Sequence, residues 1–181
     1  ENNDRSYPSD DCPSGRLPGN NGAWRGEKGS LYEGGTRVPT LVSWPGRIKP
    51  GKVAAPVHIT DWMPTFAALA GYRSERDLQW DGTDILPLLT THTPPPERTL
   101  YGVAPNFRAQ AVHRGDWKLV VTAPAAPNAK KKSAATPAIE ELFNLRDDPA
   151  EAKNLATVRP DILAQLRAHL AAASARDRDS V

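Results

Sequence analysis

The sequence contains one cysteine and one methionine in 181 residues. A single cysteine excludes an internal disulfide framework, and the polar surroundings of Cys12 favour an exposed thiol over a nucleophile. No apolar run approaches the roughly 20 residues needed to cross a bilayer, so we expect no membrane span. The chain starts at Glu1 with no signal peptide pattern, and we therefore expect it to begin inside a longer protein.

The sequence also lacks a strong excess of charge of either sign. Its formal net charge is +2, and apart from residues 130–132 its basic side chains are scattered along the chain. Nucleic-acid binding usually requires a dense basic patch, so the composition predicts no polyanionic partner. Hydrophobic residues make up 39% of the chain, with 18 prolines and 13 glycines, which indicates a loop-rich globular protein with a modest core.

Glycines and cations are concentrated in residues 23–39. Four glycines let the backbone take left-handed or close-approach conformations, and Arg25, Lys28 and Arg37 place positive charge among them. Such a segment suits a small anion. The ordinary alternative is a surface loop with solvated charges, and the spacing of a phosphate-binding P-loop is absent.

The first half of the chain predicts few regular elements. Residues 1–22 are polar and typical of a long loop, whereas residues 40–44 form a short apolar run typical of a buried strand. Residues 53–59 are expected to be extended. A helix should follow, capped by Thr60 or Asp61 and ended by Gly71, with an inward apolar stripe. The stripe consists of Phe66, Leu69 and Ala70.

The second half predicts a small sheet and a terminal helix. Residues 84–89 favour a short helix, and the prolines at 94–96 mark a boundary. Alternating segments at 99–103, 109–113 and 117–122 predict strands, with a hairpin turn at 114–116 and a further strand at 141–145. Residues 123–137 are an Ala, Pro and Lys-rich excursion of unknown role. Apolar residues at helical spacing after Pro160 predict a helix packed on the sheet.

Residues 25–39, RGEKGSLYEGGTRVP, resemble the second signature region of the type I sulfatases, the arylsulfatase family. Further matching segments occur in the same order. They are WPGRI at 44–48, TDWMPT at 60–65, DGTD at 81–84, RGDWKL at 114–119, ELFNL at 141–145, DPAE at 148–151 and NL at 154–155. The resemblance covers most of the chain, and its ordered spacing is more specific than any single segment.

The resemblance implies an alkaline-phosphatase-like α/β fold, of which this chain would be a C-terminal portion. Residues 1–93 would form the end of the large α/β catalytic domain. Residues 94–181 would form a small α+β C-terminal subdomain with an antiparallel sheet and a C-terminal helix. The implied activity is hydrolysis of a sulfate ester to an alcohol and sulfate.

For the site, the resemblance implies that Lys28 is both catalytic and substrate-binding, as the lysine that contacts the sulfate. Arg25, Glu33 and Arg37 are expected to stabilise the loop through ion pairs and backbone hydrogen bonds, with no catalytic role. The family uses Ca²⁺ and a formylglycine nucleophile, and no metal-ligating residue of this chain is assigned. The segment CPSGR at residues 12–16 departs from the Cys-x-Pro/Ala-x-Arg maturation motif, and its position also argues against it. We therefore expect the chain alone to hydrolyse nothing.

Other candidate residues have plainer interpretations. Ser9-Asp10-Asp11 lacks the asparagine and the preceding strand of the family's metal motif, so it is interpreted as loop. His58 and Asp61 stand three residues apart like a metal pair, but the helix start favours a capping role for Asp61 and a partly buried neighbour in His58. His113 lies on a predicted strand, where a structural role is favoured over one at the rim of a substrate pocket.

Two alternatives to a sulfatase remain open from the sequence. One is another alkaline-phosphatase-like enzyme that hydrolyses phosphate or phosphonate esters, and the other is a non-catalytic binding module. The expected partner is a sulfated small molecule or sulfated glycan. The resemblance also implies a periplasmic or secreted location, whereas the natural substrate and the oligomeric state are left undetermined.

Overall fold

A computed structural model describes residues 20–123 and 137–177 of the chain. The predictions made for Cys12, for Ser9-Asp10-Asp11 and for most of the 123–137 excursion lie outside these residues. The described residues form two compact units. One comprises residues 20–37, 101–112, 116–123 and 137–177, and the other comprises residues 38–100 and 113–115. The expected division of the chain at residues 93 and 94 stays a prediction.

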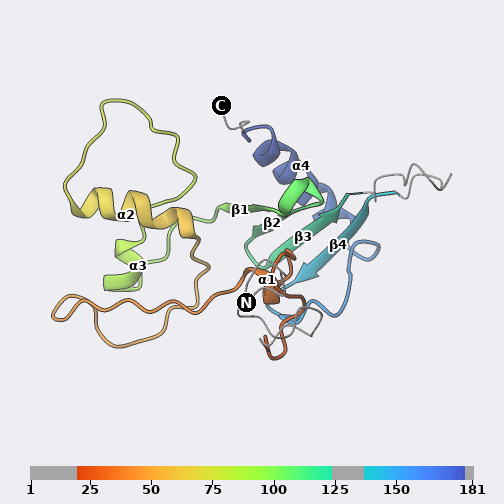
Figure 1. Ribbon diagram of the computed structural model, residues 1–181, viewed down its shortest axis with the longest axis horizontal. Coiled ribbons are helices and arrows are strands. Elements are labelled where there is room, and N and C mark those ends of the chain that lie inside the picture. The colour runs from red at the N-terminus through yellow and green to blue at the C-terminus, as the bar shows by residue number, and fades with distance from the viewer. Residues whose placement is uncertain (1–19, 124–136, 178–181) are drawn as a thin grey trace, which may run out of the picture. The chain divides into compact units, whose positions relative to one another are not determined.

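A four-stranded sheet organises the first unit, with its strands in the order β1-β2-β3-β4 (Figure 1). The strands are β1 (Thr99–Val103), β2 (Ala109–Arg114), β3 (Trp117–Thr122) and β4 (Ile139–Asn144). β3 and β4 are antiparallel, with Leu119 opposite Leu142. Gly115 turns the chain between β2 and β3 at a φ of 59°, a left-handed conformation that glycine adopts without steric cost. The predicted strands and hairpin are confirmed.

One face of the sheet is covered by helix α4 (Pro160–Ser174), which begins with proline where its missing N–H does no harm. Leucines spaced three or four residues apart on α4 pack against one side chain from each of β2, β3 and β4. The buried cluster consists of Val112, Leu119, Leu142, Leu163, Leu166 and Leu170. The predicted C-terminal helix is therefore confirmed, including the face that it buries.

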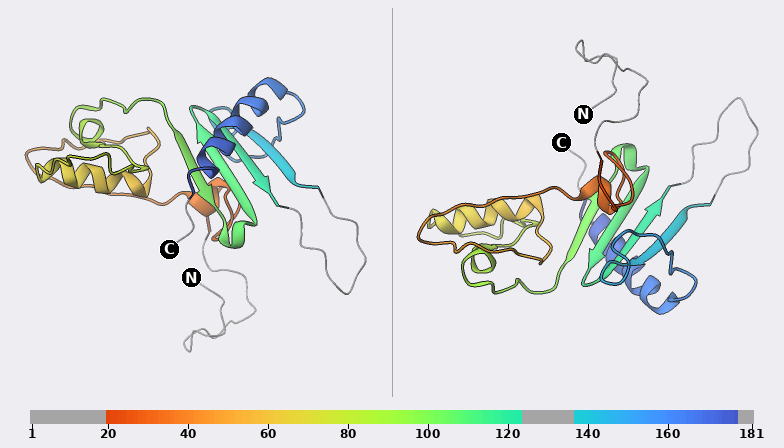
Figure 2. Two further views of the ribbon diagram at one scale, coloured as in Figure 1. Left: turned by 90° about the horizontal axis from the view of Figure 1, so that it is seen from above. Right: turned by 90° about the horizontal axis from the view of Figure 1, so that it is seen from below.

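The opposite face of the sheet is covered by the glycine-rich loop and helix α1 (Glu33–Thr36) (Figure 2). Successive residues of a strand point to opposite faces. Val120 and Phe143, which follow Leu119 and Leu142, therefore face this side and pack with Leu31. This contact was not predicted from the sequence. It places the glycine-rich loop on a rigid, two-sided scaffold.

The second unit contains the 3-10 helix η1 (Ile59–Asp61) and the helices α2 (Trp62–Leu69) and α3 (Leu86–Thr91). α2 ends as predicted at Gly71, whose φ is 70°. The N–H groups of Gly71 and Tyr72 donate to the carbonyls of Ala68 and Ala67, which is the Schellman pattern.

The apolar stripe predicted for α2 is wrong. Phe66 and Leu69 are 58% and 42% exposed, and the helix instead buries Pro64 and Thr65. Hydrogen bonds of a polar side chain decide which side of the helix is buried. The Thr65 hydroxyl donates to the carbonyl of Asp61 and accepts the N–H of Ile85, which turns this side of the helix toward the chain before α3.

The strand predicted at residues 40–44 is also wrong, since these residues are neither helix nor strand and Leu41 is 94% exposed. Residues 53–58 likewise form no β-strand. An apolar run predicts a strand only if a neighbouring strand satisfies its backbone groups, and no such strand lies beside this run in the described part of the chain.

Candidate functional site

Close backbone packing shapes the loop that holds Arg25, Lys28 and Arg37. Gly26 and Gly29 have φ values of 85° and 88°. The N–H of Gly34 donates to the carbonyl of Arg25 at 2.7 Å, which closes the loop on itself. A Cβ atom at Gly34 would lie 2.4 Å from the carbonyl oxygen of Gly26. The loop conformation therefore requires glycine at this position.

The N-terminal arm of the loop is attached to the sheet through Arg25. Its guanidinium lies 3.0 Å from the Glu141 carboxylate on β4, donates to the carbonyl of Glu151 at 3.2 Å, and sits 3.9 Å from the centre of the Tyr32 ring. The Tyr32 hydroxyl donates to the other oxygen of Glu141. Burial and then this bond to Glu141 raise the pKa of Tyr32 to about 12, so the phenol stays protonated and keeps donating at neutral pH.

The C-terminal arm is attached through a buried group of charges. Glu33 of α1, Lys118 of β3 and Glu151 are 6%, 4% and 0% exposed. The Lys118 ammonium donates to Glu33 at 2.8 Å and lies 2.9 Å from Oε1 of Glu151. The second oxygen of Glu151 accepts the backbone N–H of Glu33 at 2.6 Å. With Arg37 paired to Glu33, the formal charges of this group cancel.

These contacts shift the two carboxyl groups in opposite directions. Burial alone would raise the pKa of Glu33, but Lys118 and Arg37 outweigh it and lower that pKa below its usual value. Burial dominates at Glu151 and raises its pKa. The Oε1 atom of Glu151 has Lys118 within ion-pair distance but without hydrogen-bond geometry. Lys118 therefore compensates Glu33 more completely than Glu151.

Lys28 differs from the other charged residues of the loop. It lies in a turn and is exposed. Within residues 20–123 and 137–177, its side chain makes no hydrogen bond or ion pair. The structure thus shows Arg25, Glu33 and Arg37 in the ion pairs expected of them and leaves the Lys28 ammonium accessible. An accessible cation on an anchored loop can bind an anion without first breaking an existing ion pair.

Three partners of the loop were not predicted from the sequence, namely Lys118 on β3, Glu141 on β4 and Glu151 in the chain after β4. A signal for them was present. In the sequence, three apolar residues follow Lys118 in succession and Leu142 is followed by Phe143, which is typical of strands covered on both faces. A lysine inside such a strand is buried, and a buried lysine is nearly always paired.

His58 and Asp61 do not form a metal pair. The ring of His58 accepts the N–H of Thr60, and the Asp61 carboxylate accepts the N–H of His58 in return. Asp61 also receives the N–H of Thr83 and both ends of the Arg98 guanidinium. Burial would raise the pKa of Asp61, but these donors lower it. No group of three or more potential metal ligands is present in the described part of the chain.

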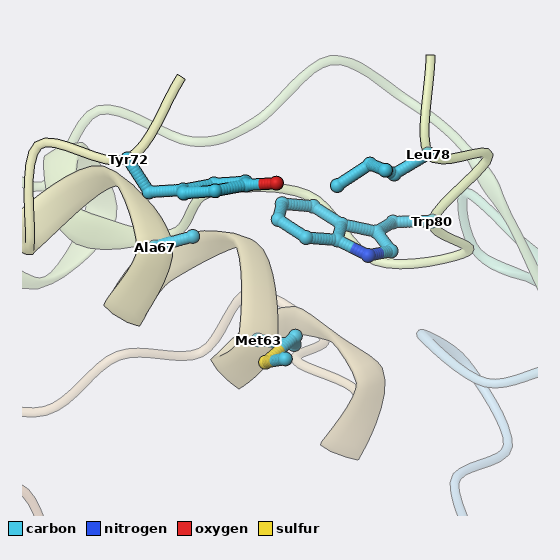
Figure 3. A pocket seen from close by; sticks show the side chains of 5 residues that line it. All are labelled: Met63, Ala67, Tyr72, Leu78 and Trp80. Carbon is cyan, nitrogen blue, oxygen red and sulfur yellow. The ribbon is translucent and has the colours of Figure 1, made fainter. Parts of the chain in front are cut away.

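The second unit contains a hollow of about 360 Å³ lined by apolar and aromatic side chains. Figure 3 shows Met63 and Ala67 on α2, with the rings of Tyr72 and Trp80 and the side chain of Leu78 on the chain that follows. No charged side chain lines it. The hollow therefore offers no positive charge to an anion, and the loop around Lys28 is the better candidate site.

Comparison with known proteins identifies the family. The family model described as Sulfatase matches residues 4–72, which include the whole loop. Arylsulfatase A of Homo sapiens is 32% identical over 169 residues, covering 82% of this chain and 32% of that protein. The chain belongs to the sulfatase family. Steryl-sulfatase of Mus musculus is 49% identical over 75 residues, covering 41% of this chain and 12% of that protein.

Solved structures support the sulfatase fold. One, from work on glycosaminoglycan metabolism by Bacteroides thetaiotaomicron, has a TM-score of 0.71 and 27% identity, and the match covers 85% of this chain and 32% of that one. A sulfatase from Pseudoalteromonas has a TM-score of 0.66 and 25% identity, covering 84% and 32%. The expected alkaline-phosphatase-like fold, with an antiparallel sheet and C-terminal helix, is confirmed. The chain spans less than a third of the length of the curated relatives that it matches.

None of the helices in the described part of the chain is long and apolar enough to span a membrane.

Proposed function

We propose that this chain forms part of a sulfuric ester hydrolase and that Lys28 contacts the sulfate group of the substrate. One observation carries the proposal. In a loop that lies within the region matched to sulfatases, every other cation is engaged in an ion pair or ring contact, whereas Lys28 is exposed without a partner among the described residues.

The chemistry gives such a lysine a clear role. Hydrolysis of a sulfate ester moves negative charge from the sulfate toward the leaving oxygen, and a fixed cation beside the sulfate stabilises this charge. The lysine ammonium is a compact charge with three donors on a long stem, so it can reach a sulfate oxygen from an exposed position. Anchoring at both arms keeps the loop from relaxing as the charge moves.

The family resemblance also implies calcium and formylglycine. The described residues contain no group suited to hold a metal ion, and they include no cysteine from which formylglycine could form. We therefore assign neither group to these residues, and the role of Lys28 is limited to binding the sulfate and balancing its charge.

The substrate class is proposed only broadly, as a sulfated small molecule or a sulfated glycan. The names of the relatives point to different substrates, since they include a steryl-sulfatase, a choline-sulfatase and an N-acetylgalactosamine-6-O-sulfatase. The sulfate is the part that these substrates share, and Lys28 is proposed to recognise that part. The periplasmic or secreted location remains a prediction.

A binding titration tests the proposal. The chain is titrated with 4-nitrophenyl sulfate while the amide signals of the loop are followed by NMR. Lys28→Gln is compared with Lys153→Gln, which removes the same charge from an exposed position of the same unit. An exposed ion pair contributes ~0.2–1 kcal/mol, so Lys28→Gln should weaken binding by a factor of about 1.4 to 5. Equal affinities for the two variants would contradict the proposal.

The same titration with methyl 4-nitrophenyl phosphate, a diester that carries one negative charge as the aryl sulfate does, tests the phosphate-ester alternative. Preference for the phosphate at equal charge would favour a phosphoryl-transfer enzyme over a sulfatase. A turnover assay with the aryl sulfate in the presence of calcium completes the test. We expect no product from the chain alone, and turnover that Lys28→Ala abolishes would refute the expectation that the nucleophile lies outside this chain.

A further inference from the structure

The tip of the loop, residues 27–30, lies between two segments that are anchored to the rest of the unit. The anchors are the contacts of Arg25 on one arm and those of Glu33 on the other. Between them, Ser30 closes the turn through its N–H and its hydroxyl, both of which donate to the carbonyl of Glu27. These bonds are local, so they define the turn without attaching it to the sheet.

Within the described residues, one hydrogen bond joins this turn to the chain that enters β2, in addition to the packing of the neighbouring Leu31 on Val120 and Phe143. A terminal nitrogen of Arg108 donates to the carbonyl of Gly29 at 2.5 Å. A Cβ atom at Gly29 would lie 2.9 Å from that nitrogen, so the absence of a side chain allows the close approach. Gly29 directly follows Lys28. Its φ of 88° lies in the left-handed region, which glycine enters and leaves without steric cost. The bond from Arg108 therefore restrains Gly29 in addition to the bonds that close the turn.

Arg108 is itself held in place by the sheet. It lies between the 3-10 helix η2 (Pro105–Phe107) and the first residue of β2. Its carbonyl accepts the N–H of Ala123, just beyond the end of β3, at 2.8 Å. Its guanidinium therefore extends from a backbone position that does not depend on the loop.

We propose that Arg108 is a positioning residue for Lys28, which it orients by holding the carbonyl of Gly29. This inference rests on the proposed sulfate contact of Lys28. Without Arg108, the arms stay anchored through Arg25 and Glu33 while the tip samples more conformations. The Lys28 ammonium then reaches the sulfate in a smaller fraction of them, and affinity falls although the fold is intact.

Hydrogen exchange tests the structural half of the proposal. In Arg108→Met, the amide of Ser30 at the tip should exchange about tenfold faster, because local opening becomes easier. The amide of Gly34, which belongs to the anchored part, should keep its rate. Arg146→Met is the matched control, since it removes an exposed arginine from the same unit that pairs with Asp116 rather than with the loop. Unchanged exchange at Ser30 in Arg108→Met would overturn the inference.

A double-mutant cycle with 4-nitrophenyl sulfate tests the functional half. Arg108→Met should weaken binding in the wild-type background by up to about fivefold, which is the upper limit expected for Lys28→Gln, and should have no further effect in Lys28→Gln. Arg108→Lys should retain part of the affinity that Arg108→Met loses, because the contact with the Gly29 carbonyl is a single hydrogen bond that an ammonium can also donate. Free guanidinium ion should partly restore the affinity of Arg108→Ala for 4-nitrophenyl sulfate. It is added only at concentrations that leave the Arg146→Met control folded.

The outcomes separate the two proposals. If Lys28→Gln leaves affinity unchanged, the proposed function fails. If Lys28→Gln weakens binding and Arg108→Met does not, only the positioning role fails. If the two effects are additive, Arg108 acts on the anion independently of Lys28, which also overturns the positioning role.

Discussion

Lys118→Met tests the buried charge group beneath the loop. The substitution keeps a long unbranched side chain and removes the ammonium that lies 2.8 Å from Glu33 and 2.9 Å from Glu151. Both carboxylates are at most 6% exposed, so water cannot replace the lost charge. Of the two cations only Arg37 remains, and of the two carboxylates it pairs with Glu33 and not with Glu151.

The expected effect is large. At an effective dielectric constant of about 20, each contact corresponds to roughly 6 kcal/mol of attraction before the cost of burying the charges is subtracted. Removing one partner of a buried ion pair typically costs about 3–5 kcal/mol. We expect Lys118→Met to lower the free energy of unfolding by this amount at neutral pH, measured by urea denaturation with circular dichroism. The loss should shrink in acid, where the carboxylates become protonated.

A loss this large is a substantial part of the stability of a small domain, and the variant could fail to fold. The variant Glu33→Gln/Lys118→Met/Glu151→Gln keeps the test decisive, because it removes all three charges of the group together. We expect it to recover most of the lost stability. The reasoning is refuted if Lys118→Met stays within about 0.5 kcal/mol of wild type, or if the triple variant is no more stable than the single one.

Three further predictions concern the fold. Leu119→Ala removes a fully buried side chain and should cost about 2–5 kcal/mol, whereas Leu41→Ala at a 94% exposed position should change stability by less than about 0.5 kcal/mol in the same urea assay. Gly82→Ala places a Cβ atom 2.1 Å from the carbonyl oxygen of Thr60 and should lower the melting temperature, unlike Gly51→Ala, whose Cβ has only ordinary contacts. Asp61 has a pKa lowered below 3.8 in the folded chain, so its contribution is present above about pH 3.8 and is lost as the pH falls further. The stability difference between wild type and Asp61→Asn should therefore shrink below that pH, and a constant difference would contradict the assigned contacts of Asp61.

The sheet and the terminal helix could be predicted because their signals are local. Alternation in residues 117–122, the turn at Gly115 and the leucine spacing after Pro160 each depend on a few neighbouring residues. The stripe on α2 could not be predicted in the same way. Which side of that helix is buried depends on Thr65 bonding to Ile85, twenty residues away, and apolar spacing carries no information about that bond.

The candidate site was predicted only in part, because its local signals were visible in the sequence and its distant contacts were not. The family resemblance indicated Lys28, and beside it Arg25, Glu33 and Arg37 were expected to stabilise the loop through ion pairs. The partners of those charges lie 85 to 126 positions further along the chain, on β3, on β4 and at Glu151. Residue spacing within the loop cannot specify contacts at that separation. Only the structure therefore shows how the loop is attached to the sheet.

The central claim is that the ammonium of Lys28 binds a sulfate ester. The most direct measurement follows the side-chain Cε signals of Lys28 and Lys153 by NMR as 4-nitrophenyl sulfate is added at constant ionic strength. We predict a saturable shift at Lys28 and little change at Lys153. Equal shifts at both lysines, or no shift at Lys28, would contradict the claim.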